Sequence, residues 1–297
     1  MPELLSLKLD KIIFRKLING VKDFQALSKA QTDWRLAHEH SIETKDLFAS
    51  LMEAKDPETG NGLNEDQIVA ETGSLLLAGS DTQATALAAA LFYCLHYPAT
   101  LCTLQDEIRT TFAEVEEIRI GKQLSSCRYL RACIDEALRL SPPIGGLLQR
   151  EVLPGGFVVD GERIPAGVDI GVPHYAIHHN ETYYPEPFSF RPERWIASSE
   201  PSDLGVPGAA VSLAQSAFSA FGVGRTSCVG KTLAYTEMSI ILARMIWLYD
   251  LRLQSGSTLG EGSPRLGENR SRKDEFQTFD GFFSTHDGPL VEYKLRL

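Results

Sequence analysis

The most apolar stretch of the chain runs from Glu65 to His96 and carries hydrophobic residues around its whole circumference. This pattern predicts a long central helix that is buried by its neighbours. Asn64 and Gln67 have the spacing of a capping pair at the beginning of that helix. Pro98 disfavours helical backbone at the residue before it, so we expect the helix to end near His96.

Helical periodicity predicts further helices on both sides of the central one. They cover residues 4–30, 42–54, 98–113, 126–140 and 229–249.

The segment 147–172 has a different pattern, with β-favouring residues between glycine- and proline-containing turns. Such alternation predicts short hairpins. Near the C-terminus, residues 276–283 and 290–297 predict a second pair of strands that lie together. The predicted fold class is therefore mainly α with small β-sheets, and the pattern shows no domain boundary.

Composition narrows the classes of function. The chain has 297 residues, 43% of them hydrophobic, which is enough for a sizeable core. A net charge of −10 argues against nucleic acid or an anionic membrane surface as the main partner. No apolar run reaches the roughly 18–20 residues that span a bilayer, and Met1–Phe14 reads as neither a signal peptide nor an anchor. Five cysteines without CxxC spacing predict reduced thiols in a reducing compartment.

Cys228 follows a glycine-rich turn and opens an apolar helix, in the run Phe221-Gly222-Val223-Gly224-Arg225-Thr226-Ser227-Cys228-Val229-Gly230. A helix N-terminus with Arg225 and Lys231 nearby stabilises a thiolate, which is a strong, soft ligand for iron. Gly230, which has no Cβ, permits a flat group to approach closely. The alternative is that Cys228 is an ordinary buried thiol.

This run resembles the haem-binding loop of the cytochrome P-450 family. By that resemblance Cys228 is the axial ligand of haem iron, and the other cofactor-binding residues of the loop are Phe221, Gly222, Gly224, Arg225 and Gly230. A thiolate ligand pushes electron density toward bound oxygen and favours its cleavage. The family usually has a basic residue two positions before the cysteine, where this chain has Thr226.

Asp81 and Thr82 lie in the run Ala78-Gly79-Ser80-Asp81-Thr82 of the central helix. Glycine and hydroxyl side chains weaken a helix locally, so a kink is expected there. An acid in an apolar face is costly to bury, which favours a purpose such as proton delivery. The run resembles the oxygen-activating segment of the same family, in which Thr82 and Asp81 are catalytic. The alternative is a simple kink with Asp81 as a local cap.

Glu136 and Arg139 lie three residues apart on one predicted helix and therefore face each other. ExxR is a weak motif, and the chain holds another at Glu116–Arg119. Downstream, Phe190-Arg191-Pro192-Glu193-Arg194-Trp195 resembles the family segment that adds a second arginine. By that resemblance Arg194 joins Glu136 and Arg139 in a structural cluster that fixes the meander before the cysteine loop.

Arg150, at the beginning of the first β segment, resembles an arginine that pairs with a haem propionate; the alternative is a surface charge on an edge strand. Residues 142–148 are then expected to line the substrate pocket. His174, His178 and His179 follow no metal-binding spacing, and we expect them at the surface or at a β-edge.

The resemblance implies the C-terminal portion of the cytochrome P-450 fold: a long kinked central helix, the ExxR helix, the meander, the cysteine loop and the helix that follows. Residues 1–297 are expected to form a single partial catalytic domain, similar to filamentous-fungal members, without the N-terminal anchor and early helices of a full-length member.

The implied activity is that of a haem b monooxygenase, which inserts one oxygen atom from O2 into an apolar small molecule. Electrons are expected from NADPH through a flavoprotein reductase, and the setting resembles fungal secondary metabolism. A full-length relative is expected at the endoplasmic reticulum membrane, and the chain as given in the cytosol. The alternatives are a truncated haem-binding remnant or mispredicted gene product without turnover, and a haem-binding sensor.

Overall fold

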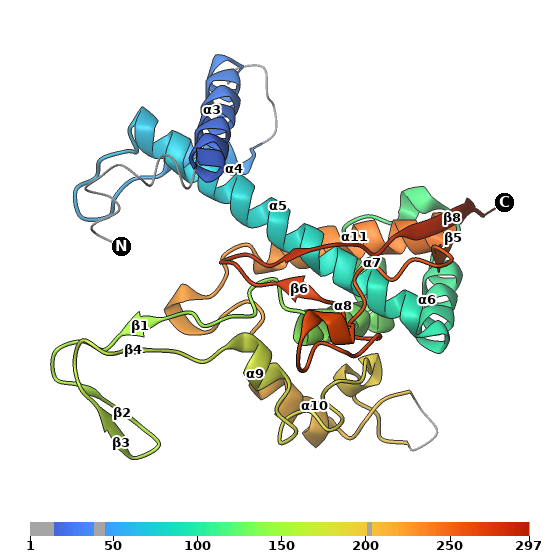
Figure 1. Ribbon diagram of the computed structural model, residues 1–297. Helices are drawn as coiled ribbons and strands as arrows, with labels where there is room; N and C mark the ends of the chain where they lie inside the picture. Colours follow the sequence, from blue (N-terminus) through green and yellow to red (C-terminus); the bar gives the residue numbers. More distant parts are fainter. Residues whose placement is uncertain (1–14, 39–44, 201–203, 297) are drawn as a thin grey trace. The chain divides into compact units, whose positions relative to one another are not determined.

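The computed structural model describes residues 15–38, 45–200 and 204–296, with no account of the side chains of residues 15–17. The chain divides into two compact units, residues 1–80 and 81–297, and helix α5 belongs to both. Figure 1 shows the elements in chain order. The α-helices are α3 (Arg15–Ala37), α4 (Leu47–Glu53), α5 (Glu65–His96), α6 (Pro98–Thr111), α7 (Lys122–Ser126), α8 (Arg128–Leu140), α9 (His174–His178), α10 (Gly208–Ser216) and α11 (Lys231–Leu248).

Four antiparallel pairs of short strands complete the described secondary structure. The strands are β1 (Arg150–Glu151), β2 (Phe157–Val159), β3 (Glu162–Ile164), β4 (Asp169–Ile170), β5 (Tyr249–Leu253), β6 (Thr278–Phe279), β7 (Thr285–His286) and β8 (Val291–Leu295). Strand β1 pairs with β4 and β2 with β3, as predicted for hairpins in 147–172. The short 3-10 turns are η2 (Val115–Glu117), η3 (Pro192–Trp195), η4 (Gly224–Thr226) and η5 (Pro264–Leu266).

The predicted pairing of the two C-terminal strands is wrong. Strand β8 pairs with β5, which directly follows α11, and the register sets Tyr249 opposite Leu295. Strand β6 pairs instead with β7. The hydrophobic pattern of α11 continues into Tyr249, so the pattern alone does not mark where the helix ends and β5 begins.

Helix α5 has the predicted bounds, and its N-terminus is a reciprocal cap. The Gln67 backbone N–H donates to Asn64 Oδ1 and the Asn64 N–H donates to Gln67 Oε1, both at 2.9 Å. This exchange satisfies two of the donors that a helix N-terminus leaves free. Predicted helices 4–30 and 42–54 correspond to α3 and α4, and residues 4–14 and 42–44 lie outside the described residues.

The core of the second unit forms where the C-terminal half of α5 meets α6, α8 and α11. Its fully buried side chains include Phe92, Tyr93, Leu104, Ile134 and Leu242. By length and composition alone, α5 is the one described helix that could span a membrane. A core helix passes the same test, and the burial of Phe92 and Tyr93 is that of a core helix. Only 28% of the apolar stretch is buried, however, and the predicted burial of the whole helix is wrong for its largely exposed N-terminal half.

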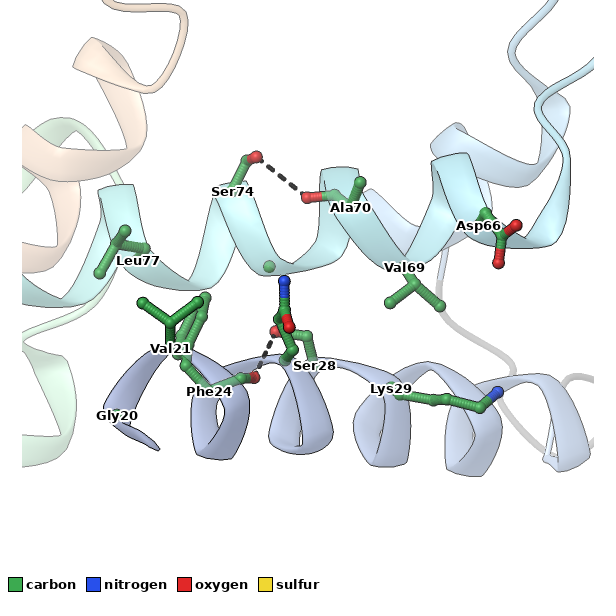
Figure 2. A pocket seen from close by; sticks show the side chains of 12 residues that line it. Gly20, Val21, Phe24, Ser28, Lys29, Asp66, Val69, Ala70, Ser74 and Leu77 are labelled. Carbon is green, nitrogen blue, oxygen red and sulfur yellow. Dashed lines mark hydrogen bonds between the residues drawn. The ribbon is translucent and has the colours of Figure 1, made fainter. Parts of the chain in front are cut away.

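In the first unit, α3 and the N-terminal half of α5 run side by side and border an open apolar groove of about 1170 Å³ (Figure 2). Gly73 of α5 lies against Ser28 of α3, where an added Cβ would meet Ser28 Oγ at 2.9 Å. A larger residue at position 73 would therefore require the Ser28 hydroxyl to move away.

Candidate functional site

Residues 219–230, here called the Cys228 loop, place an exposed thiol just before α11. Gly222 and Gly224 have φ of +69° and +73°, a conformation that side chains with a Cβ rarely adopt. These turns bring the Cys228 backbone N–H to the Phe221 carbonyl at 2.8 Å. The sequence therefore folds the loop into a closed turn whose cysteine is presented to the outside.

The surroundings of the Cys228 sulfur fit a flat apolar group that carries a metal. Val223 and Val229 are 72% and 98% exposed beside it. An added Cβ on Gly230 would lie 3.8 Å from Cys228 Sγ, so glycine keeps this approach open. Among the described residues no cluster of three or more His, Cys, Asp or Glu side chains could chelate a metal ion. Haem-thiolate ligation through a single cysteine does not require such a cluster.

Arg150 reaches the Cys228 loop from strand β1. Its Nη2 donates to Thr226 Oγ1 at 3.3 Å, and its Nη1 donates to the Gln149 carbonyl at 2.7 Å. Arg225 is exposed on the same loop. The Lys231 ammonium lies 5.7 Å from the centre of the Phe221 ring. Cationic side chains from β1, from the loop itself and from the first residue of α11 therefore lie on or against the Cys228 loop.

Glu136, Arg139 and Arg194 come together, as the resemblance to the family implied. Arg139 Nε and Nη2 donate to the two oxygens of the Glu136 carboxylate at 2.9 Å each. Arg194 Nε donates to Glu136 Oε1 at 2.8 Å. Glu136 and Arg139 are fully buried and Arg194 is 6% exposed. Burial raises the pKa of the Glu136 carboxyl, but the two guanidinium groups outweigh it and hold that pKa below its usual value.

Two further donors to Glu136 were not predicted from the sequence. Trp195 donates its indole Nε1–H to Glu136 Oε2 at 2.9 Å. The Arg191 backbone N–H donates to Glu136 Oε1 at 3.0 Å. The sequence held one indication of the Trp195 contact, because Trp195 directly follows Arg194 and a buried indole N–H needs an acceptor.

The same two arginines bind the irregular segment 178–195, here called the meander. The carbonyls bound by Arg139 are those of His178 (2.8 Å), Pro187 (2.7 Å) and Ser189 (3.3 Å), and those bound by Arg194 are Pro185 (3.2 Å) and Glu186 (3.4 Å). Backbone groups without helix or sheet partners are thus satisfied by side chains. The cluster fixes the path of the chain toward the Cys228 loop.

The prediction that His174 and His178 lie at the surface or at a β-edge is wrong. They are 8% and 0% exposed in helix α9, and burial lowers the pKa of both side chains, that of His178 to about 3. His179 is half-buried, and burial lowers its pKa to about 4. Three histidines close together in sequence resemble a surface segment, but the packing of α9 decides their environment.

Asp81 and Thr82 lie in the part of α5 that belongs to the second unit. Asp81 is exposed and Thr82 is half-buried, so the expectation that Asp81 is buried in an apolar face is wrong. One residue further, Gln83 donates its side-chain amide to the Glu237 carboxylate of α11. The Ser80 hydroxyl bonds back to the Leu76 carbonyl at 2.8 Å, a contact that bends helices. This segment therefore lies beside α11, the helix that follows Cys228.

Comparisons with known proteins agree with this arrangement. The family model "Cytochrome P450" matches residues 7–264. The chain is 41% identical over 289 residues to cytochrome P450 monooxygenase AKT7 of Alternaria alternata, covering 97% of this chain and 55% of that protein. It is 42% identical over 305 residues to cytochrome P450 monooxygenase apf7 of Gibberella fujikuroi, covering 100% and 56%. The chain thus spans about half the length of these curated relatives.

Among solved structures, the chain is similar to a crystallised cytochrome P450, CYP102L1, with a TM-score of 0.70 at 23% identity. The match covers 93% of this chain and 56% of that one. The described helices and small sheets are therefore those of the cytochrome P450 fold. The chain belongs to the cytochrome P450 family.

Proposed function

We propose that this chain carries the haem-thiolate site of a monooxygenase that inserts one oxygen atom from O2 into an apolar small molecule. The observation that carries the proposal is the exposed Cys228 thiol, on a residue whose backbone N–H donates to the Phe221 carbonyl and whose sulfur Gly230 leaves uncrowded. Relatives named cytochrome P450 monooxygenases support the reaction class.

In this proposal Cys228 holds the iron of haem b, which when bound supplies the activation of O2. Because Gly230 has no Cβ, the haem ring would be able to approach the sulfur closely. Phe221, Gly222 and Gly224 give the loop its shape. When haem is bound, Arg150 and Arg225 would pair with its propionates. Thr226 stands where the family usually has a basic residue, and its contact with Arg150 supports a role for Arg150 as a replacement cation.

Asp81 and Thr82 are proposed to deliver protons to the reacting oxygen, because a carboxylate and a hydroxyl can pass a proton through water. The half-buried position of Thr82, beside the α5–α11 contact of Gln83 and Glu237, supports this role. Glu136, Arg139 and Arg194 are proposed to hold the meander and to take no part in the chemistry.

The proposed partners are a flavoprotein reductase that passes electrons from NADPH and an apolar substrate. We propose that residues 1–297 are part of one catalytic domain acting inside the cell. The fungal origin of the relatives supports a role in secondary metabolism.

The test is spectroscopic. The purified chain is loaded with haem, reduced with dithionite and treated with carbon monoxide, and the red-shifted Soret band of a thiolate-ligated complex is expected. Cys228→Ser should lose this band. Cys102→Ser, which also removes an exposed thiol, should keep it. A Cys228→Ser chain that retains the band contradicts the ligand assignment.

A chain that binds haem without turnover is the second candidate. The exposed apolar run Leu75–Leu77, with side chains 41%, 40% and 36% exposed, favours it, because a complete substrate site is expected to cover such a surface. Substrate-dependent NADPH consumption with a reductase separates the two candidates. Turnover supports the monooxygenase, and the haem band without turnover supports the second candidate.

A further inference from the structure

His178 bridges the end of helix α8 and the beginning of the Cys228 loop. We propose that His178 is a positioning residue, whose imidazole holds the Cys228 loop in the geometry that thiolate ligation needs. This inference rests on the proposed function, because it concerns the same thiolate. It assigns a role to a residue outside the loop and outside the Glu136 cluster.

The hydrogen bonds of the ring fix its protonation state. His178 Nδ1 lies 3.1 Å from the Arg139 carbonyl oxygen, which can only accept, so Nδ1 carries the proton. The Ser219 backbone N–H donates to His178 Nε2 at 2.9 Å, so Nε2 carries none, and the Ser219 hydroxyl lies 3.3 Å from the same nitrogen. One neutral imidazole therefore satisfies a carbonyl in the last turn of α8 and an amide in the Cys228 loop.

Backbone hydrogen bonds within the loop connect Ser219 to Cys228. The Gly222 N–H donates to the Ser219 carbonyl at 2.7 Å, and the Cys228 N–H donates to the Phe221 carbonyl at 2.8 Å. His178 thus holds the first residue of a loop whose own hydrogen bonds place Cys228.

Packing keeps the His178 ring in this orientation. The side chain is fully buried, and its ring stacks on Phe218 with centroids 5.4 Å apart and an angle of 13° between planes. In return, Arg139 Nη1 donates to the His178 backbone carbonyl at 2.8 Å. Burial lowers the pKa of the ring to about 3, so Nε2 stays an acceptor at neutral pH.

Two substitutions at position 178 test the hydrogen bonds of the two ring nitrogens separately. His178→Asn keeps a donor near the Nδ1 position but is too short to accept from Ser219. The longer His178→Gln can place its carbonyl oxygen near the Nε2 position. His174→Asn is the matched control, because His174 is buried in the same helix and its Nδ1 donates to the Ile144 carbonyl at 3.0 Å, away from the Cys228 loop.

The readouts are the share of thiolate-type Soret band in the reduced carbon monoxide complex and the iodoacetamide alkylation rate of Cys228 in the haem-free chain. Loss of one hydrogen bond predicts a roughly fivefold lower ratio of thiolate-type to thiol-type complex for His178→Asn. The alkylation rate should change as well. His178→Gln should recover both values, and His174→Asn should match the wild type.

Equal values for His178→Asn and His174→Asn would overturn the inference. A wild-type chain without the thiolate band would contradict the proposed function, while alkylation of the haem-free chain still decides the role of His178. If His178→Asn does not fold, hydrogen exchange of the wild-type Ser219 amide replaces it. Protection of this amide supports the bond to Nε2, and exchange at the rate of an unstructured amide overturns it.

Discussion

Trp195 donates its indole N–H to the Glu136 carboxylate, which already binds the side chains of Arg139 and Arg194. With the Arg191 backbone N–H, the two oxygens accept five hydrogen bonds at 2.8–3.0 Å. A carboxylate offers about four lone-pair sites, so its acceptor capacity is fully used. Glu136 is therefore the residue through which α8 is joined to the meander and to its last turn, η3.

Replacing the indole tests the strength of this contact. Trp195→Phe should lower the free energy of unfolding by about 1.5–3 kcal/mol, because its N–H is bonded to a charged acceptor. Trp247→Phe is the control, since the Trp247 indole donates to the neutral Phe112 carbonyl at 3.0 Å. Its loss should cost about 0.5–1.5 kcal/mol. Urea titrations of both variants measure the difference, and equal losses would argue against a special role for the carboxylate.

Removing the charge of Glu136 should have a larger effect. Glu136→Gln leaves two buried guanidinium groups without their counter-ion and should cost about 3–5 kcal/mol of unfolding free energy. Glu116→Gln alters the other ExxR motif, at an exposed position, and should leave stability near that of the wild type. Thermal unfolding followed by circular dichroism compares them. A Glu136→Gln chain as stable as Glu116→Gln would refute the structural role.

The folded chain should lose stability as the pH falls below the ordinary pKa of histidine. The pKa of His178 is about 3 and that of His179 about 4, against 6.5 for an ordinary histidine. As pH falls below 6.5, the unfolded chain binds protons that the folded chain does not, so stability is full above pH 6.5 and declines toward pH 3. His178 alone should cost about 2 kcal/mol at pH 5.

Chemical denaturation at pH 7 and pH 5 measures this decline. The carboxyl of Glu136, whose pKa is lowered from 4.5, loses its contribution only at lower pH and does not act in this window. His178→Gln should make the dependence shallower. A wild-type chain with equal stability at both pH values would show that these histidines are not held neutral.

Two glycines of the Cys228 loop should respond differently to alanine. Gly230 has an ordinary φ of −82°, so Gly230→Ala should fold, but its methyl group crowds the face beside the sulfur and should weaken haem binding by about 1–3 kcal/mol. Gly224 has a φ of +73° and nothing within 4 Å of an added Cβ.

Gly224→Ala should therefore cost about 1–2 kcal/mol of folding free energy through backbone strain alone. Haem titration and urea denaturation of both variants separate the effects. Tight haem binding by Gly230→Ala would contradict the close approach proposed for the ring.

Local patterns predicted local structure well. The bounds of α5 follow from its cap and from Pro98, because capping depends on residues adjacent in sequence. The meeting of Glu136 with Arg139 also follows from helical spacing. The place of Arg194 came from resemblance to a family, since nothing in the sequence alone brings residues 58 positions apart together.

Long-range contacts account for what the sequence did not predict. Strand β8 pairs with β5, and this pairing depends on the path of the chain after η5, which a local sequence pattern does not predict. The burial of His178 depends on Arg139 and Ser219, which lie 39 and 41 residues away. Polar residues in a meander look exposed unless the side chains that satisfy them are known, and these come from other elements.

The binding of meander carbonyls by Arg139 has a consequence for folding. Its partners His178, Pro187 and Ser189 lie 39, 48 and 50 residues further along the chain. Contacts this distant in sequence require a large loop to close before they gain any stability. The path of the meander, and with it the approach to Cys228, therefore depends on a side chain of α8 that is distant in the sequence, and not on the meander's own residues alone.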